Sequence, residues 1–307
     1  MPHQALTRRR LSQGFAAVVG AAATGSTSVF ASAHHTLKLG DAEIIVLSDG
    51  HLTLTPRNLA ATVPDAQLHV AAKTTDTVNV PTNVTLVRTG KDVILIDVGA
   101  GPNFMGTAGK LADSLAAAKI DPASVTKVVF THGHPDHLWG VIDEFDNSPR
   151  FPNARYVMSE AEWALWMSGD PLSKVPANRQ NFVPGAVRNL QAIKDRITFV
   201  KPGQEVGPGL TAIDTSGHTQ GHISIQIASG RETLVVLGDA LTHPVISFEH
   251  PEWRPEADHD PERAVATRKA LLDRLATEKT RILGFHLPFP GLGQVERRGA
   301  GYVYRVA

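Results

Sequence analysis

Four side chains able to bind a metal ion lie close together in the segment T-H-G-H-P-D-H at 131–137. They are His132, His134, Asp136 and His137. In an extended stretch His132 and His134 point to the same side, because side chains alternate with a period of two residues. Pro135 then redirects the chain, so that the two later side chains are able to face a second ion. Because imidazoles and carboxylates are costly to bury without partners, the cluster predicts a metal site rather than core packing.

Three further candidate ligands occur singly, each directly after a segment that predicts a β-strand. They are His218, Asp239 and His286. The ends of strands are where α/β sheets display functional groups, and nearby glycines allow tight turns and close backbone approach. Each of the three alone also fits a structural role. Together with the cluster at 131–137 they predict one site assembled from distant parts of the chain.

Short runs rich in β-branched residues predict the strands that position these side chains. The runs cover 43–47, 84–88, 93–97, 125–130, 210–214, 223–228, 234–239 and 281–285. Apolar residues at helical spacing predict helices over 104–119 and 159–167. Asp260 and Pro261 predict the start of a third helix, which continues toward Lys279. Between these elements, residues 168–184 have weak periodicity and predict a long loop or lid.

Composition narrows the chemistry. The 307 residues include no cysteine, which excludes disulfides, thiolate zinc sites and cysteine nucleophiles, so any metal must rely on His, Asp or Glu. Hydrophobic residues at 42% and charged residues at 20% are typical of a soluble globular protein. The arginines at 8–10 are the only charged residues before position 34, which leaves 27 basic and 30 acidic residues in 34–307. This balance offers no electrostatic footprint for nucleic acid.

The first 33 residues predict an export signal. Three arginines at 8–10, a weakly apolar stretch at 14–29 and A-S-A at 31–33 supply a basic head, an apolar middle and a small-residue cleavage site. The paired arginines resemble the twin-arginine type, with a Sec signal or an uncleaved tail as alternatives. We therefore expect a periplasmic or secreted protein in which 34–307 form a single catalytic domain without a membrane span.

The order H-x-H-x-D-H followed by separate His, Asp and His resembles the signature of the metallo-β-lactamase superfamily. The resemblance covers essentially all of 34–307 and implies an α/β fold, an αββα sandwich of two mixed β-sheets flanked by helices. It implies that one ion is held by His132, His134 and His218, the other by Asp136, His137 and His286, and that Asp239 bridges the two. It also implies that Asp97 supports the ligand loop by hydrogen bonds, although an acid at a strand end is equally consistent with a turn.

Two divalent ions with two aspartates and a bridging hydroxide form a centre of net positive charge. A bound zinc ion lowers the pKa of water to about 7, and such a centre stabilises negative charge that develops on a carbonyl or phosphoryl oxygen. The predicted reaction is hydrolysis by the metal-bridging hydroxide, with Asp136 and Asp239 as the catalytic carboxylates. Zinc is the expected metal, with iron, manganese and cobalt as alternatives, because sites of His and Asp accept each of them.

Two shorter segments, 284–291 and 99–106, resemble the methyl parathion hydrolase branch, which contains phosphotriesterases, lactonases and arylesterases. That branch implies an aromatic, apolar pocket. The candidates for its wall are Phe104, Trp163 and Phe182. Trp163 and Trp166 are three residues apart, a spacing that core packing also explains. An apolar wall predicts a small neutral ester, lactone or phosphotriester as the substrate.

The remaining histidines fit supporting roles. His222, four residues after His218, is expected to contact the ligands or to pack beside them, and His243 is expected to line the site after Asp239. Six others have no matching context and are expected to be at the surface or structural: His34, His35, His51, His69, His250 and His259.

These features leave three functions open. The first is a secreted dinuclear hydrolase of lactones and aryl esters, with organophosphate triester hydrolysis as a second activity. The second is an acyl-homoserine lactonase that attenuates bacterial signalling. The third, of a different class, is a non-catalytic periplasmic metal-binding protein, which would bind metal without turnover. The resemblance also suggests a homodimer.

Overall fold

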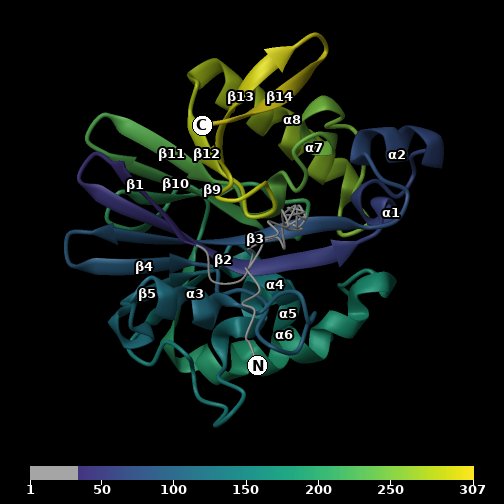
Figure 1. Ribbon diagram of the computed structural model, residues 1–307. Helices are drawn as coiled ribbons and strands as arrows, with labels where there is room; N and C mark the ends of the chain where they lie inside the picture. Colours follow the sequence, from purple (N-terminus) through teal and green to yellow (C-terminus); the bar gives the residue numbers. More distant parts are fainter. Residues whose placement is uncertain (1–33) are drawn as a thin grey trace, which may run out of the picture.

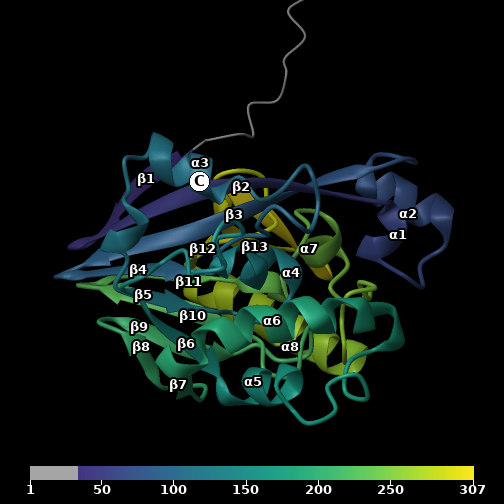
Figure 2. The same ribbon diagram turned by 90° about the horizontal axis from the view of Figure 1, so that it is seen from below.

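The computed structural model describes residues 34–307 as two seven-stranded β-sheets packed face to face, with helices on both outer faces (Figures 1 and 2). The expected αββα sandwich of two mixed sheets is confirmed. The export signal predicted for residues 1–33 lies outside the described residues, so export stays a prediction. Within 34–307, no helix combines the length and the apolar character that crossing a membrane requires.

The first sheet contains seven strands in chain order. They are β1 (His34–Leu39), β2 (Ala42–Leu54), β3 (Val78–Thr89), β4 (Asp92–Ile96), β5 (Lys127–Val129), β6 (Arg155–Ser159) and β7 (Ile197–Val200). Strands β1 to β4 pair antiparallel, whereas β4 to β7 pair parallel. The parallel half places the carboxyl ends of neighbouring strands at one edge of the sheet.

The second sheet also follows chain order. It contains β8 (Glu205–Gly207), β9 (Leu210–Asp214), β10 (Ile223–Ser229), β11 (Glu232–Val236), β12 (Arg281–Leu283), β13 (Leu292–Arg298) and β14 (Gly301–Val306). Its only parallel pair among the described residues is β11 with β12, which the helix α8 (Pro261–Glu278) connects. A parallel pair requires such a crossover, and the crossover brings the ends of β11 and β12 to the same edge.

Alternating side chains along the strands form separate layers of the core. In β2, Ile44 and Val46 pack between the two sheets, whereas Ile45 and Leu47 pack toward the helices that cover the first sheet. Those helices are α3 (Leu111–Ala117), α5 (Glu160–Trp166) and α6 (Val183–Ile193), while α7 (Ile246–Glu249) and α8 pack on the second sheet. Each fully buried aliphatic side chain stabilises the fold by about 1.5–3 kcal/mol. The sandwich therefore holds the strand ends rigidly.

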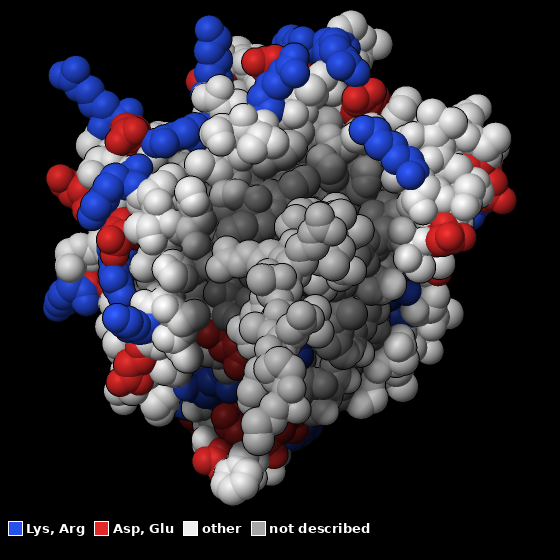
Figure 3. Space-filling view, viewed as in Figure 1, with Lys and Arg blue, Asp and Glu red and all other residues white. Residues whose placement is uncertain are grey.

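Two short helices, α1 (Pro56–Leu59) and α2 (Asp65–Ala72), lie beyond the end of β2, at one side of the sandwich (Figure 1). Figure 3 shows the charged side chains of this view mostly around its periphery, with both signs interspersed over the described part of the face. This mixture of positive and negative side chains is consistent with the near balance of basic and acidic residues in the sequence.

The predicted helix over 104–119 is shorter in the structure, because α3 begins only at Leu111. The buried carboxylate of Asp49 in β2 accepts hydrogen bonds from the backbone N–H groups of Ala100 at 2.8 Å, Gly109 at 3.1 Å and Leu111 at 2.7 Å. These bonds hold the preceding residues as a loop, which competes with the helix for the same backbone donors.

The segment predicted as a long loop over 168–184 is only partly irregular. It contains the 3₁₀ helix η3 (Ala177–Phe182) and leads directly into α6, a helix that the sequence reading missed. Pro184 and Gly185 at the start of α6 obscured it, although proline is tolerated in the first helical turn. Gly185 is required there, because a Cβ atom would lie 2.2 Å from the ring of Trp139.

Candidate metal centre

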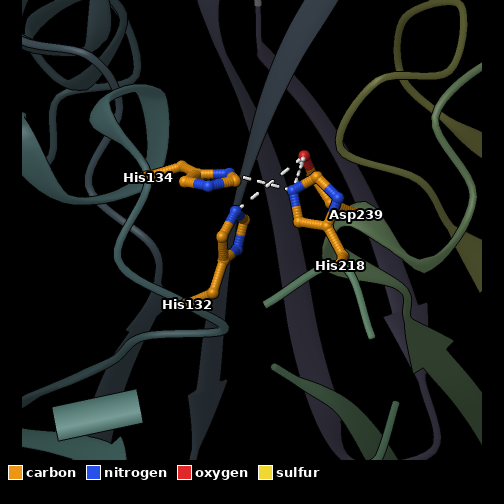
Figure 4. A group of neighbouring side chains, drawn as sticks. All are labelled: His132, His134, His218 and Asp239. Atoms are coloured by element: carbon orange, nitrogen blue, oxygen red, sulfur yellow. Dashed lines mark hydrogen bonds and ion pairs between the residues drawn. The ribbon is translucent and has the colours of Figure 1, made fainter. Parts of the chain in front are cut away.

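The seven predicted ligands come together at one edge of the sandwich. His132 and His134 follow β5, and Asp136 and His137 lie in the short helix α4 (Pro135–Leu138). The three others lie in the loop after β9, in the 3₁₀ helix η5 (Gly238–Ala240) after β11, and after β12: His218, Asp239 and His286. Figure 4 shows His132 and His134, from one loop, turned toward His218 and Asp239, which come from two other segments.

The donor atoms form two neighbouring groups. The first group is His132, His134, His218 and Asp239, and the second is Asp136, His137 and His286. Within each group the donor atoms lie within 4.8 Å of one another, and all seven residues are buried. The carboxylate of Asp239 faces both groups, because it lies 3.2 Å from His218 Nε2, 3.0 Å from His137 Nε2 and 3.3 Å from His286 Nε2. This is the position that a bridging ligand requires.

Several of these atoms lack a hydrogen-bond partner among the described residues. They are His132 Nε2, His137 Nε2, Asp136 Oδ2 and Asp239 Oδ1. The atoms lie within ion-pair distance of their neighbours but direct no hydrogen bond at them. Leaving a buried polar atom unsatisfied costs about 1–3 kcal/mol, and a bound cation removes that cost. A set of imidazole and carboxylate donors suits zinc and neighbouring transition metals, so the residues fit two metal ions.

Electrostatics of the metal-free cluster point the same way. Burial opposes a charge on His218 and His286, but the surrounding carboxylates together outweigh it: Asp239 with Asp258 raises the pKa of His218 to about 9, and Asp239 with Asp136 raises the pKa of His286 to about 10. Burial also opposes the charge on Asp239, yet His286, His137 and His218 lower its pKa well below the ordinary value. The carboxylate thus stays ionised and gathers positive charge around itself. Divalent cations supply that charge in place of protons, which couples metal binding to proton release.

Asp97 holds the loop 131–137, which carries four of the candidate ligands. Its Oδ2 accepts from His137 Nδ1 at 2.8 Å and from the hydroxyl of Thr131 at 2.8 Å, and its Oδ1 accepts from the backbone N–H of Thr131 at 2.8 Å. Asp97 has φ +61°, a left-handed conformation that Asp tolerates better than most residues. The structure therefore places Asp97 where the resemblance implies. Its three hydrogen bonds to the ligand loop are more than the role of a turn residue would require.

A second buried carboxylate, Asp258, supports His218 and was missed from the sequence. Its Oδ1 accepts from His218 Nδ1 at 3.0 Å, and its Oδ2 accepts from Arg268 Nη2 at 3.0 Å. Arg268 is 3% exposed on the apolar face of α8 and also donates to the carbonyl oxygens of Pro251 and Trp253. Such partners fix the tautomer and orientation of a metal-binding imidazole. An arginine at a core-facing helix position was the available signal.

Glu162 joins the ligand loops of the two sheets and was also missed. Its carboxylate accepts from the backbone N–H of Gly133 at 2.8 Å, the indole of Trp166 at 2.6 Å, the hydroxyl of Thr219 at 2.6 Å and the backbone N–H of Gly221 at 3.1 Å. The two glycines permit this approach, because a Cβ at Gly133 would lie 2.3 Å from Trp166 and one at Gly221 would lie 2.0 Å from the backbone of Glu162.

The expectation that His259 is unrelated to the site needs correction. Its Nε2 lies 3.1 Å from His134 Nε2, and its backbone N–H donates to the carbonyl oxygen of His218 at 2.9 Å. His134 turns its other nitrogen, Nδ1, toward His218 Nε2 at 2.9 Å. The contact between His134 and His259 arises from residues 125 positions apart, which no local pattern announces.

His222 and His243 hold neighbouring groups rather than joining the donor set. His222 Nε2 accepts from the backbone N–H of Asp239 at 2.9 Å, and burial lowers the pKa of His222 to about 3, which keeps it a neutral acceptor. His243 Nδ1 accepts from the backbone N–H groups of Val245 at 3.2 Å and Ile246 at 3.1 Å, at the start of α7. His243 and His286 both line a cavity of about 360 Å³.

A cavity of about 400 Å³ opens onto the metal cluster. Ligands from both donor groups line it: His134, Asp136, His218, Asp239 and His286. Its apolar lining is Leu52, Leu54, Leu59, Val80, Phe104, Met105, Phe182, Pro255 and Ala257. Phe104 and Phe182 meet edge to face with their ring centroids 5.8 Å apart. Two of the three predicted aromatic residues, Phe104 and Phe182, therefore lie in the wall of the cavity.

Trp163 does not lie in that wall, which corrects the prediction. Its ring lies 5.4 Å from that of Phe199 in β7 and packs on the core beneath the first sheet. Trp166, three residues later, is the tryptophan close to the cluster, with its ring centroid 6.0 Å from that of His134. The helix register decides this, because Glu162 and Trp166 share the face that meets the ligand loops, and Trp163 is turned away from it.

Comparison with known proteins agrees with this geometry. The sequence profile of the Metallo-beta-lactamase superfamily matches residues 77–286. Metallo-beta-lactamase domain-containing protein 1 of Xenopus laevis is 30% identical over 191 residues, 62% of this chain and 65% of that protein. The protein of the same name from Homo sapiens is 27% identical over 190 residues, 60% of this chain and 58% of that protein. The chain thus spans less than two thirds of the length of these relatives.

Solved structures match over more of the chain. AidC, a dizinc quorum-quenching lactonase in complex with a product, has a TM-score of 0.84 and 29% identity, covering 89% of this chain and 97% of that one. The hydrolase AbOPH has a TM-score of 0.82 and 31% identity with the same coverage. The profile spans more than half of the chain and the predicted ligands converge within it, so this chain belongs to the metallo-β-lactamase superfamily.

Proposed function

We propose that this metal-dependent hydrolase of the metallo-β-lactamase superfamily cleaves lactones and aryl esters with two divalent metal ions, zinc being the expected metal. One observation carries the proposal: two groups of buried donor atoms, sharing Asp239, border a cavity whose lining is largely apolar. The likeness to AidC, a dizinc lactonase, supports lactones as the principal substrates.

Bound divalent ions would supply Lewis acidity and lower the pKa of water at this site. The residues of the chain supply position and shape. Asp97 and Asp258 fix the orientation of His137 and His218, and His222 holds the backbone of Asp239. Phe104 and Phe182 bind the apolar part of the ester and keep bulk water out.

The leaving oxygen needs a proton unless it departs as a stable anion. Asp136 lines the cavity, and its Oδ2 lies 3.2 Å from His286 Nε2, so this carboxylate is placed to pass the proton of the attacking hydroxide to the leaving oxygen of a lactone, which leaves the product as a carboxylate and an alcohol. The described residues that line the cavity include no tyrosine or lysine. Phenolate leaving groups depart without such help, which favours aryl esters as the second substrate class.

Among lactones, we propose acyl-homoserine lactones as the first to test, because AidC is a quorum-quenching lactonase. Organophosphate triesters are a second, slower activity in this proposal. A centre that stabilises negative charge on a carbonyl oxygen does the same for a phosphoryl oxygen. The apolar lining suits neutral triesters better than charged monoesters.

The test measures the hydrolysis of three substrates: an acyl-homoserine lactone, phenyl acetate and methyl paraoxon. Each substrate is given to the purified protein, to the chelated protein and to the protein restored with zinc. We expect turnover in the order lactone, aryl ester, triester, with loss on chelation and recovery on restoration. Elemental analysis of each sample gives the metal content. Restored metal without turnover of any of the three esters would instead support a metal-binding protein.

We also propose that the protein is exported, since the arginines at 8–10 are followed by an apolar stretch and A-S-A at 31–33. Mass spectrometry of the periplasmic fraction is expected to find a chain that begins near residue 34. Protein that retains Met1 in that fraction would contradict cleavage of the signal.

A further inference from the structure

One arginine stands out in the lining of the cavity. Arg179 lies in η3, directly before α6, and its side chain is 15% exposed. No other arginine or lysine occurs among the described residues that line this cavity. Apart from the candidate metal ligands, the described lining of the cavity therefore presents one cationic side chain, in a wall that is otherwise largely apolar.

Most hydrogen-bond donors of Arg179 are unused by residues 34–307. Nη1 donates to the carbonyl oxygen of Asn178 at 3.1 Å, and Nη2 lies 4.0 Å from Glu256 Oε2, beyond hydrogen-bond distance. A guanidinium group carries five N–H donors, so several remain for a ligand. The carbon of the guanidinium lies 5.7 Å from the ring centroid of Phe182, a contact that restricts the side chain.

The position of Phe182 relates Arg179 to the reaction site. The ring centroid of Phe182 lies 5.8 Å from that of His134, a predicted metal ligand. Phe182 therefore contacts both the guanidinium and the metal cluster, so Arg179 lies about one aromatic ring away from the reacting ester. A ligand group that reaches Arg179 must be attached to that ester by a short spacer.

The charges around Arg179 decide which ligand group it binds. Glu256 lies beside the guanidinium and already accepts from Asn58 Nδ2 at 2.6 Å, which fixes its carboxylate in place. A carboxylate on the substrate would meet this negative charge as well as the arginine. A neutral carbonyl oxygen accepts an N–H of Arg179 without adding charge, and hydrogen bonds to charged groups contribute about 1.5–3 kcal/mol.

We propose that Arg179 selects esters and lactones that carry a neutral carbonyl acceptor, such as an acylamino group, on a short spacer from the scissile bond. The chain attached to that carbonyl then lies against the apolar lining formed by Phe104 and its neighbours. This inference rests on the proposed function and names the substrate feature that the same site recognises.

The experiment uses two lactones of matched chain length, one with an acylamino group and one with an alkyl group in its place. Arg179→Met keeps an unbranched apolar side chain, although a shorter one, and removes the charge and the N–H donors. We expect the ratio of kcat/KM between the acylamino and alkyl lactones to fall about 10- to 100-fold in this variant, the loss expected for a hydrogen bond to a charged group. Arg188→Met, in the exposed part of α6 where Arg188 pairs with Glu144, is the matched control and leaves the ratio unchanged.

A binding measurement keeps the inference testable apart from turnover. Calorimetry compares the affinity of the metal-loaded protein for the two ring-opened hydroxy acids, with and without the acylamino group. The wild type is expected to bind the acylamino acid about tenfold or more tightly, and Arg179→Met is expected to lose that preference while retaining its metal content. Equal affinity of the wild type for both acids, or an unchanged preference in Arg179→Met, would overturn the role of Arg179. Lack of turnover with a retained binding preference would instead contradict only the proposed function.

Glu256→Gln sharpens the charge argument. Because this change removes the fixed negative charge beside Arg179, a lactone that carries a carboxylate is expected to gain about tenfold in kcat/KM or in product affinity. No gain for the carboxylate ligand would mean that Glu256 does not tune the site, and the preference for a neutral acceptor would be wrong.

Discussion

The candidate metal ligands from the first sheet and those from the second sheet form two halves of the site, and these halves are built in different ways. On the side of the first sheet, the loop 131–137 supplies four ligands from one strand end, and Asp97 holds that loop through Thr131 and His137. On the side of the second sheet, three ligands come from three loops and each has its own partner: Asp258 for His218, His222 for Asp239, and the carbonyl oxygen of Pro81 for His286. In the contiguous loop two carboxylates, Asp97 and Glu162, serve four candidate ligands, whereas each scattered ligand has a partner of its own.

The largest effect is expected where the two halves meet, at Asp239. Asp239→Asn removes the charge that faces both donor groups, so both ions bind more weakly and kcat falls by about three orders of magnitude. Steady-state kinetics and elemental analysis measure the two effects. Asp214→Asn, at the exposed end of β9, is the control for loss of an aspartate. Near-normal rates in Asp239→Asn would refute the bridging role.

The next effect concerns the arginine behind the second half. Arg268→Met removes the guanidinium from the buried carboxylate of Asp258, which keeps its contact with His218, and breaking a buried ion pair costs about 3–5 kcal/mol. Urea unfolding measures the loss of stability in the metal-free protein. Arg268→Met combined with Asp258→Asn is expected to recover part of the loss, because no charge is then left unpaired. A double variant as unstable as the single one would show that Arg268 acts through packing.

On the side of the second sheet, acid is expected to destabilise the start of α7 through His243, which accepts hydrogen bonds there. Burial lowers the pKa of His243 from 6.5 in the unfolded chain to about 4, so the neutral ring contributes its stability fully above pH 6.5 and loses it as the pH falls toward 4. The contribution is about 3 kcal/mol. His243→Asn keeps an acceptor for the same backbone donors without a titrating ring. The difference in unfolding free energy between the wild type and this variant should therefore shrink from pH 7 to pH 4, and a constant difference would contradict the assignment.

The smallest effects test the comparison directly. Loss of a partner behind a metal ligand typically costs 10- to 100-fold in metal affinity. We expect Asp97→Asn near the upper value, because Asp97 anchors a loop with four ligands, and Asp258→Asn near the lower value, because Asp258 supports one. Equilibrium dialysis against zinc measures both. Equal losses would show that the contact of Glu162 with Gly133 is sufficient to hold the loop without the charge of Asp97.

The sequence was sufficient to predict the donor set because its signals are local. The residues 131–137 are contiguous, and each remaining ligand follows a strand whose β-branched run is visible on its own. The two-sheet architecture follows from the same runs, since strands with apolar side chains on both faces need a layer on each side. In β2 the alternation of Ile44 and Ile45 between two cores shows this directly.

The supporting groups were beyond the sequence because long-range contacts create their roles. Glu162, Asp258 and His259 occur in ordinary local contexts, and only folding brings Asp258 to His218, 40 positions away. The error at Trp163 has a similar cause, since spacing places two tryptophans on one helix but does not say which one faces the cluster. Helix α6 was missed because Pro184 and Gly185 interrupt its pattern, although Gly185 is what lets the helix meet Trp139.

The apolar lining of the cavity has a consequence for how this protein changes over time. Leu52 and Leu54 belong to the end of β2, Leu59 to α1, and Phe104 and Met105 to the loop between β4 and α3, none of which carries a candidate metal ligand. Substitutions there alter the shape offered to an ester without moving the groups that hold the ions. Selection can therefore change the substrate preference of the protein while the residues that are expected to hold the metal ions stay the same.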